Sequence, residues 1–243
     1  MRCWRRSKAG TVRPSLHERH DVRLPLSRNR KAIVSLMTAS ASIPQFGIDA
    51  DVDLTQLLAL REREARFSIG DAVLRAAALA LRAHPELNTS FDDDAVVRHG
   101  SVNLGLGIIG PEGLMVVVVR DADRLSIGEI ASERSRLAEA AEQGRLRGEE
   151  VVGATFVISN LGPAGVSRFQ ALLVPPASAI LAVGAVKEQV RLTEGGVEAF
   201  SALTVCLTCD HRVVDGLDGA RFLETFTTSL EQPVPLLAGE EWT

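Results

Sequence analysis

The chain has 243 residues, of which 46% are hydrophobic and 24% charged, and its formal net charge is −4 at pH 7. This composition suits a globular protein with one sizeable core or two small ones. The longest aliphatic run, from Leu114 to Val119, fits a buried strand and is too short for a membrane span. Three cysteines provide no disulfide framework. We therefore expect a cytoplasmic protein that does not associate with a membrane.

Charge is distributed unevenly along the chain. The first 30 residues hold nine Lys or Arg and only two acidic residues, so the remainder is acidic. A basic arm can contact nucleic acid or an acidic partner, but scattered Pro, Ser and Gly favour a flexible leader over residues 1–23. The acidic body argues against a nucleic-acid-binding domain. We predict a single folded domain over residues 24–243 and no nucleic-acid partner.

Helix and strand signals alternate along the body of the chain. The expected helices are Arg28 to Thr38, a second from an Asp53 cap to about Glu64, a third that a Ser68 and Asp71 capping box opens and Pro85 ends, Ile127 to Arg145 before Gly148, and about Gly219 to Leu230. The expected strands are VNLGLGIIG (102–110), LMVVVV (114–119), ATFVIS (154–159), AILAVGAV (179–186) and LTVCLT (203–208).

Asp92 to Asp94 mark a turn before the first two of these strands, whose continuous apolar character predicts burial on both faces. The fold class that this order indicates is α/β, specifically an α+β two-layer sandwich with one mixed central sheet and helices packed on it.

Two motifs are weak candidates for a site. Cys206 and Cys209 have metal or redox spacing, but alternation along a strand sends them to opposite faces, and no second ligand pair is present in the sequence. We expect no metal site. The stretch GLGIIG (105–110) lacks the order of a dinucleotide-binding loop and lies within a strand signal.

Two other motifs place polar side chains at strand ends. ISNLG puts Ser159 and Asn160 after an apolar run, and CDHRVVDG puts His211 and Asp215 after another. Taken singly, they fit a turn that satisfies its own backbone and a surface histidine in an acidic turn. Together they supply a base and a hydroxyl donor for an oxyanion, two parts of an acyl-transfer site. Without a G-x-S-x-G elbow, we expect the nucleophile to be a substrate thiol.

The motifs occur in a recognisable order. The blocks are LPLSRNRKAI, SIPQF, DVDLTQLLALRE, RAAALALRAHPELN, VNLGLGI with EGLMVVVVRDAD, GATFVISNLG, VPPASAILAVGAV and CDHRVVDGLDGARFL. Over residues 24–237 this order resembles the catalytic domain of the dihydrolipoamide acyltransferase component of 2-oxoacid dehydrogenase complexes, which has a chloramphenicol acetyltransferase-like fold.

The resemblance implies a role for each matching residue. His211 would be the general base for the thiol of coenzyme A or dihydrolipoamide, and Ser159 would hydrogen-bond the oxyanion. Asp215 would organise the loop, through a salt bridge to Arg28 or Arg30. The positions that match coenzyme A contacts are Arg61, Ser68, Asn160 and Gly184. The histidine of one subunit of a homotrimer would face the serine of the next.

The resemblance also implies partners and leaves alternatives open. No lipoyl or peripheral subunit-binding domain is recognised, so we expect a lipoyl group supplied in trans by a lipoyl-domain protein, with a 2-oxoacid decarboxylase as a further partner. The alternatives are a noncatalytic core or scaffold subunit of the same fold and a chloramphenicol-type small-molecule acetyltransferase. The ending PLLAGEEWT favours a plain trimer over a larger cage.

Departures from the family pattern lie around the expected site. Gln45 stands where the family usually has histidine, Val117 where it has proline, Val174 where it has asparagine, and Ala177 where it has a polar residue. The sequence therefore does not indicate which acyl group is transferred.

Overall fold

The computed structural model describes residues 21–63, 67–110 and 113–237. Most of the basic arm expected over residues 1–23 lies outside the described residues, as does the C-terminal segment from position 238 that contains Trp242. Residues 21–27 are exposed and have no regular secondary structure. The domain boundary at residue 24 stays a prediction.

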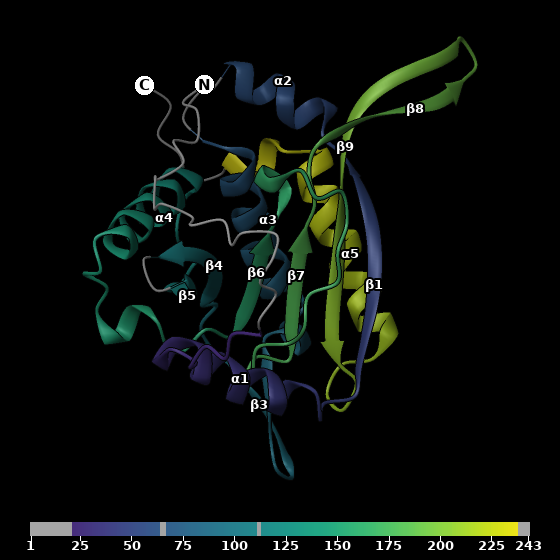
Figure 1. Ribbon diagram of the computed structural model, residues 1–243. Helices are drawn as coiled ribbons and strands as arrows, with labels where there is room; N and C mark the ends of the chain where they lie inside the picture. The colour runs from purple at the N-terminus through teal and green to yellow at the C-terminus, as the bar shows by residue number, and fades with distance from the viewer. Residues whose placement is uncertain (1–20, 64–66, 111–112, 238–243) are drawn as a thin grey trace.

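A mixed sheet of seven strands forms the centre of the molecule (Figure 1). Its order is β1-β9-β7-β6-β4-β5, with β8 also paired to β9. The strands are β1 Gln45–Asp53, β4 Leu104–Gly110, β5 Gly113–Val119, β6 Phe156–Asn160, β7 Ala179–Val183, β8 Lys187–Thr193 and β9 Gly196–Asp210. The β4–β6 and β6–β7 pairs are parallel, whereas the pairs that involve β1, β5, β8 or β9 are antiparallel. The predicted fold class is confirmed.

Strand β1 was not predicted, although its sequence alternates. Phe46, Ile48, Ala50 and Val52 belong to or pack against the main core, while the intervening residues face the other side of the sheet. This period of two is the signal of a half-buried strand. The prediction recognised only Asp53, which accepts a hydrogen bond from the Thr55 N–H at 2.9 Å where the next helix begins.

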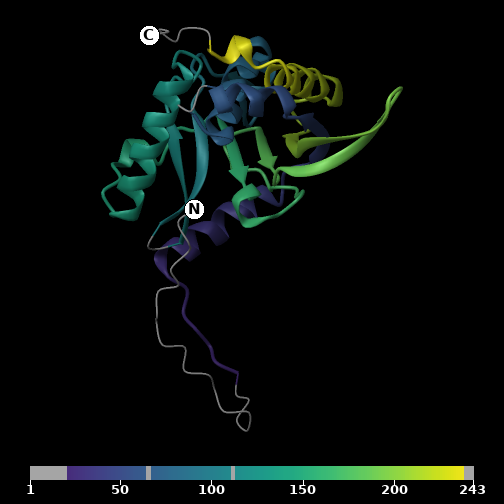
Figure 2. The ribbon, with the colours of Figure 1, turned by 90° about the horizontal axis from the view of Figure 1, so that it is seen from above.

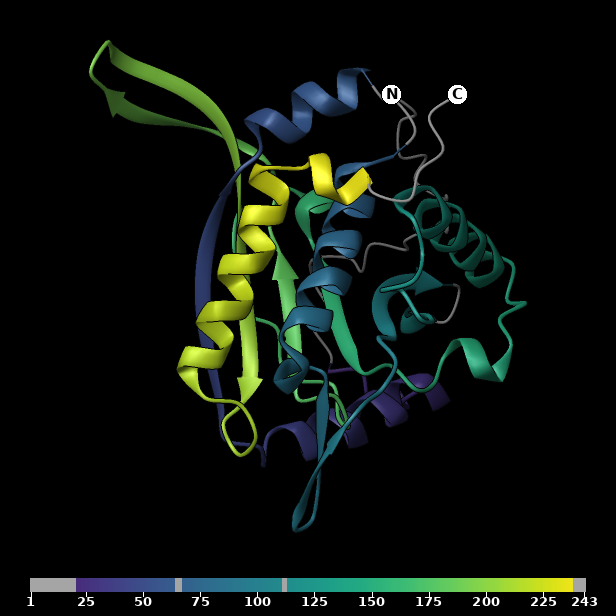
Figure 3. The ribbon, with the colours of Figure 1, turned by 180° about the vertical axis from the view of Figure 1, so that it is seen from behind.

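Helices cover one face of the sheet. They are α2 Thr55–Arg63, α3 Ile69–Ala83, α4 Ile127–Glu142 and α5 Gly216–Glu231. Figure 3 shows α3 and α5 in front of the sheet, running roughly along the strands, and α3 contacts both α5 and α4. The alanines of α3 are buried against the main core, because small side chains let a helix approach its neighbours closely. The core therefore lies between this helical layer and the sheet.

The opposite face carries less regular structure. Helix α1, Arg28–Ser40, lies on that side, as Figure 2 shows. The segment 165–177 crosses the same face, where Arg168 pairs with Asp49 at 3.0 Å and the Gln170 amide lies directly over Gly47. A smaller apolar cluster beneath it contains Val157, Leu173, Ala177 and Ile180.

Two hairpins extend away from the body (Figures 1 and 3). The first joins β8 to β9, and its Val190 and Leu192 are 71% and 86% exposed. The second joins β2 Thr89–Asp92 to β3 Ala95–Arg98, and Asp93 at its tip has a left-handed φ of 46°. The sequence predicted the turn at Asp92 to Asp94 but neither hairpin.

Several boundaries differ from prediction. Helix α4 ends at Glu142 because Gly144 adopts a left-handed φ of 64°, a common helix stop. Burial on both faces of β4 and β5 is wrong, since β5 is an edge strand and Ile109 and Leu114 are 75% and 56% exposed. Helix α5 begins at Gly216. The short 3₁₀ helices span Pro85–Leu87, Gly148–Glu150, Gly162–Ala164 and Val234–Leu237.

Candidate functional site

The carboxyl ends of β6 and β7 bring three predicted site residues together. These strands are parallel, and Ser159 lies opposite Ala182 while Asn160 lies opposite Val183. Gly184 follows directly, so it lies at the same edge of the sheet. The Asn160 Oδ1 atom accepts a hydrogen bond from the Gly162 N–H at 2.9 Å. Residue alternation places Ser159 on the face of Val157, which is the face without α3 and α5.

Gly184 leaves no room for a side chain. A Cβ atom there would lie 2.0 Å from the Ser167 carbonyl oxygen and 3.0 Å from that of Thr204. The Gly184 N–H donates to the Thr204 carbonyl at 2.9 Å, and the next N–H, of Ala185, donates to Val166 at 2.7 Å. Close backbone packing therefore requires glycine, whether or not a ligand also approaches it.

Arg61 and Ser68 lie near the break between α2 and α3. Arg61 is in the last turn of α2, and Ser68 is the N-cap of α3. The Ser68 hydroxyl donates to Asp71 Oδ2 at 2.6 Å and accepts from the Asp71 N–H at 3.2 Å. The Asp71 carboxylate is buried and also accepts from Arg134 Nε at 2.6 Å. The predicted capping box is thus confirmed.

His211 immediately follows β9 and lies partly in solvent. Its N–H donates to the Pro44 carbonyl at 2.8 Å, and its ring is 4.6 Å from the Phe46 ring, centroid to centroid. Its Nδ1 atom is 3.9 Å from Asp215 Oδ1. The two side chains are 54% and 83% exposed, so neither is enclosed within one chain.

Asp215 precedes α5 as its N-cap residue. Among the salt bridges of the described residues, its partner is His211, and none joins it to Arg28 or Arg30. The predicted ion pair with either arginine is therefore not formed within the described single chain.

The two predicted catalytic residues lie at opposite ends of the sheet. Ser159 is level with Ala182, which pairs with Cys206 on β9. From Cys206 the chain continues to His211, a length of about 16 Å at about 3.3 Å per residue. In Figure 1 the arrowheads of β6 and β7 point toward α2, whereas that of β9 points toward α1. One chain therefore does not bring Ser159 and His211 together.

Three residues around His211 were not singled out from the sequence. The Asp210 carboxylate, buried beside His211, accepts from Arg212 Nη2 at 2.6 Å, and the Arg212 guanidinium lies 4.1 Å from the centre of the Phe91 ring. The DHR order was the available signal for the acid–base pair. No local pattern could have indicated Phe91, which is distant in sequence.

The four positions that depart from the family pattern, Gln45, Val117, Val174 and Ala177, are buried or partly buried. The Gln45 amide bridges two segments, because its Nε2 donates to the Ser40 carbonyl at 2.7 Å and its Oε1 accepts from the Leu173 N–H at 3.1 Å. Ala177 and Val117 are buried. Gln45 therefore serves as a structural tie close to the His211 turn, since it pairs with Asp210 in the register of β1 and β9.

The two cysteines of CLTC lie on opposite faces, as predicted. Cys209 belongs to the main core, whereas the sulfur of Cys206 lies near Gly47 on the other face. Burial raises the pKa of each thiol to about 12, which keeps both protonated and poorly reactive at neutral pH. Within the described ranges, no cluster of His, Cys, Asp and Glu suits a metal ion, and no helix could span a bilayer.

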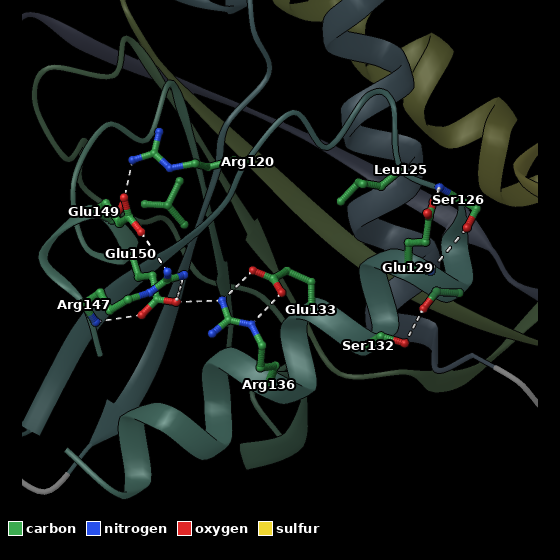
Figure 4. A pocket seen from close by; sticks show the side chains of 12 residues that line it. Arg120, Leu125, Ser126, Glu129, Ser132, Glu133, Arg136, Arg147, Glu149 and Glu150 are labelled. Carbon is green, nitrogen blue, oxygen red and sulfur yellow. Dashed lines mark hydrogen bonds and ion pairs between the residues drawn. The ribbon is translucent and has the colours of Figure 1, made fainter. Parts of the chain in front are cut away.

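A cleft of about 760 Å³ lies beside α4, away from all the predicted site residues (Figure 4). Its charged side chains neutralise one another: Arg136 binds Glu133 and Glu150 at 2.7 Å each, and Arg147 binds Glu150 at 2.9 Å. The side-chain and backbone hydrogen bonds from Arg147, with help from Arg136, lower the pKa of Glu150 to about 2. The network fastens the Gly148–Glu150 turn to α4 and leaves little unpaired charge for a ligand.

The mixed sheet with helices on one face, and the strand-end positions of Ser159 and His211, agree with the class expected from the sequence, an acyltransferase domain. The chain belongs to the family of 2-oxoacid dehydrogenase acyltransferase catalytic domains, whose model matches residues 18–238.

Individual relatives agree with the family. The chain is 39% identical over 230 residues to the dihydrolipoyllysine-residue acetyltransferase component 3 of the mitochondrial pyruvate dehydrogenase complex of Arabidopsis thaliana, covering 89% of this chain and 42% of the relative. Across the curated relatives compared, it spans between 35% and 56% of their length.

Solved structures agree as well. The dihydrolipoamide acetyltransferase of Azotobacter vinelandii superposes with a TM-score of 0.84 at 28% identity, covering 90% of this chain and 94% of that one. The cubic core of a pyruvate dehydrogenase multienzyme complex superposes with a TM-score of 0.83 at 27% identity, with the same coverage.

Proposed function

We propose that this chain transfers an acyl group between coenzyme A and a lipoyl thioester, at a site completed by two copies of the chain. One observation carries the proposal. The Azotobacter vinelandii structures concern the role of a serine, a histidine and an asparagine in the catalytic mechanism of that enzyme. The spacing of those three residues equals the spacing of Ser159, His211 and Asp215 here.

The chemistry assigned to each residue follows from its type. His211 takes the proton of the attacking thiol, whose ordinary pKa of about 8.5 lies close enough to neutrality for an imidazole base. The sulfur attacks the thioester carbonyl, and the Ser159 hydroxyl donates a hydrogen bond to the oxyanion that develops. When the tetrahedral species collapses, His211 returns the proton to the departing thiolate. No bond forms between the acyl group and the protein.

The end of the sheet near α2 suits coenzyme A. Arg61 forms no salt bridge with another described residue, so its guanidinium is a cation available to a phosphate. The N-terminus of α3, which Ser68 caps, adds the partial positive charge of a helix. Asn160 and Gly184 lie at the neighbouring strand ends. These residues would hold coenzyme A with its thiol directed toward Ser159.

The strand directions support a shared site. Within one chain Ser159 and His211 lie at opposite ends of the sheet, and Ser159 faces the side without α3 and α5. A second copy placed against that side would bring its own His211 to this Ser159. We therefore propose a homotrimer in which adjacent copies share each site, with Asp215 supporting His211 in the assembled state.

Partners and location are part of the same proposal. We propose that a lipoyl-domain protein supplies the lipoyl group in trans, that a 2-oxoacid decarboxylase component supplies the acyl group, and that the protein is cytoplasmic. A plain trimer remains our expectation for its size, although one solved neighbour is a cubic core. Light scattering on the purified protein distinguishes a trimer from a cage.

The test is transfer of an acetyl group from acetyl-CoA to free dihydrolipoamide. We expect turnover by the wild type, a loss of about 10²–10⁴-fold for His211→Ala, and about 10²–10³-fold for Ser159→Ala. Ser132→Ala, at an exposed serine of α4, is the matched control. Near-normal turnover by His211→Ala would remove that residue from the mechanism. Coenzyme A binding without turnover by the wild type would support the scaffold alternative instead.

A mixing experiment tests the shared site directly. His211→Ala and Ser159→Ala chains are refolded together, so that some interfaces combine the intact Ser159 of one chain with the intact His211 of the other. We expect part of the lost activity to return. If verified mixed oligomers turn over no faster than the two variants assayed apart, the shared site is wrong.

A further inference from the structure

The residues on either side of His211 are tied to each other. Asp210 is 2% exposed, and its carboxylate accepts hydrogen bonds from Arg212 Nη2 at 2.6 Å and Nε at 2.9 Å. The backbone N–H of Arg212 also donates to Asp210 Oδ1 at 3.0 Å. A paired contact of this kind is strong and directional. It fixes the turn in which His211 is the central residue.

The same arginine is held from outside the turn. Its guanidinium lies 4.1 Å from the centre of the Phe91 ring, on strand β2 of the short hairpin. A cation is attracted to the electron-rich face of an aromatic ring. Phe91 therefore limits where the Arg212 side chain can lie.

The base of the hairpin is joined to Asp210 by a second route. The Ser178 N–H donates to the Thr89 carbonyl at 3.2 Å, and their hydroxyl groups are 2.7 Å apart. The Asp210 N–H then donates to the Ser178 carbonyl at 2.8 Å. The contacts form a closed circuit, from Asp210 through Ser178 and the hairpin to Phe91 and back through Arg212.

His211 itself has few side-chain contacts. Its ring touches Phe46, and its Nδ1 atom lies 3.9 Å from the carboxylate of the exposed Asp215. The direction of the imidazole therefore depends on the backbone that carries it. That backbone is held by the hydrogen bond to Pro44 and by the Asp210–Arg212 pair.

We infer that Arg212 and Phe91 are positioning residues for His211, and that the β2–β3 hairpin thereby forms part of the catalytic apparatus. The inference rests on the proposed function. Neither residue needs to reach the reacting atoms, because a displacement of about 1 Å in a catalytic group can cost about 10²-fold in rate. The position of the hairpin therefore influences the position of the His211 imidazole, because Phe91 contacts the Arg212 guanidinium and Arg212 holds the turn.

The decisive variants change Phe91 and leave the turn intact. Phe91→Leu removes the aromatic face, and Phe91→Tyr restores it. Val97→Ala is the matched control, because Val97 pairs with Ser90 and so lies on the opposite face of the same hairpin. We expect kcat of Phe91→Leu to fall about 5- to 20-fold with KM for acetyl-CoA unchanged. Phe91→Tyr and Val97→Ala should remain within about two-fold of wild type, and all three should stay folded, with melting temperatures within about 5 °C of wild type.

A chemical readout makes the test independent of turnover. Diethyl pyrocarbonate modifies histidine, and mass spectrometry of the peptides measures its rate at His211. We expect Phe91→Leu to change that rate by at least about two-fold while Phe91→Tyr does not. A wild-type modification rate in Phe91→Leu overturns the inference, and so does an unchanged kcat or an equal loss in Val97→Ala. If His211→Ala retains full activity, the proposed function fails, and the modification rate alone decides whether Phe91 positions the ring.

Discussion

Replacing Gly184 by alanine tests the close packing at the carboxyl end of β7. The new methyl group would lie 2.0 Å from the Ser167 carbonyl oxygen, where ordinary contact needs more than 3.4 Å, and both neighbours are backbone atoms that cannot rotate away. The segment around Ser167 must move by more than about 1 Å, which strains the hydrogen bond from Ala185 to Val166. Overpacking costs about 1–3 kcal/mol and a weakened hydrogen bond about 1 kcal/mol, so we expect a loss of about 2–4 kcal/mol.

Urea unfolding of the Gly184→Ala variant measures this loss, and thermal melting gives a second value. For a domain of this size, we expect the melting temperature to fall by about 5–15 °C. Gly100→Ala is the control, because Gly100 is exposed and a Cβ there meets nothing within 4 Å. Equal stability of Gly184→Ala and the wild type would refute the packing argument. If stability is unchanged but coenzyme A binds more weakly, Gly184 is needed for ligand binding and not for packing.

Two further predictions concern ion pairs. Arg134→Ala should lower the free energy of unfolding by about 1–3 kcal/mol, because the buried Asp71 carboxylate loses its ion pair and keeps only the hydrogen bonds from Ser68. Urea unfolding measures this, and a loss below about 0.5 kcal/mol would contradict it. The pKa of Glu150 is lowered from 4.5 to about 2, first by the hydrogen bond from Arg147, so its stabilising effect is full above about pH 5 and is lost as the pH falls toward 2. The stability difference between wild type and Glu150→Gln should therefore shrink between pH 7 and pH 3, and a constant difference would argue against the shift.

The helices that were predicted best are those whose first residues form a capping motif. The capping boxes at Ser68 and Ser126 open α3 and α4, because one side chain and its partner three residues later satisfy the first N–H groups. The first box is recognisable in the sequence, and the predicted start of α4 at Ile127 is confirmed. Strand β1 carries an equally local signal in its alternation, although it was not predicted.

The hairpins could not be predicted in this way. Strand β8 is polar and exposed along most of its length, and the first half of β9 pairs with it away from the core. Their stability comes from pairing with each other and from contacts at the base, such as the ion pair between Arg191 and Asp53. A hydrophobic pattern gives no sign of a strand that is not buried.

The candidate site also contains some residues that local sequence patterns mark and others that only the structure reveals. The SN and DHRVVDG motifs marked Ser159 and His211 because polar residues interrupt an apolar strand pattern at its end. Their separation within the chain follows from the opposite directions of β6 and β9, since β7 is parallel to β6 and antiparallel to β9. The contact between Arg212 and Phe91 depends on how a hairpin folds back over a distant turn, so it required the structure.

The opposite directions of β6 and β9 have a consequence for the life of the protein after synthesis. With a shared site, a newly folded single chain contains Ser159 and His211 but is inactive, because the two side chains cannot both reach the same thioester carbonyl. Catalytic activity then requires assembly of the chains. At protein concentrations below the dissociation constant of the oligomer, activity per chain should therefore fall. Under the proposed shared site, unassembled chains would leave acyl-CoA intact, and the directions of two strands would make activity conditional on assembly.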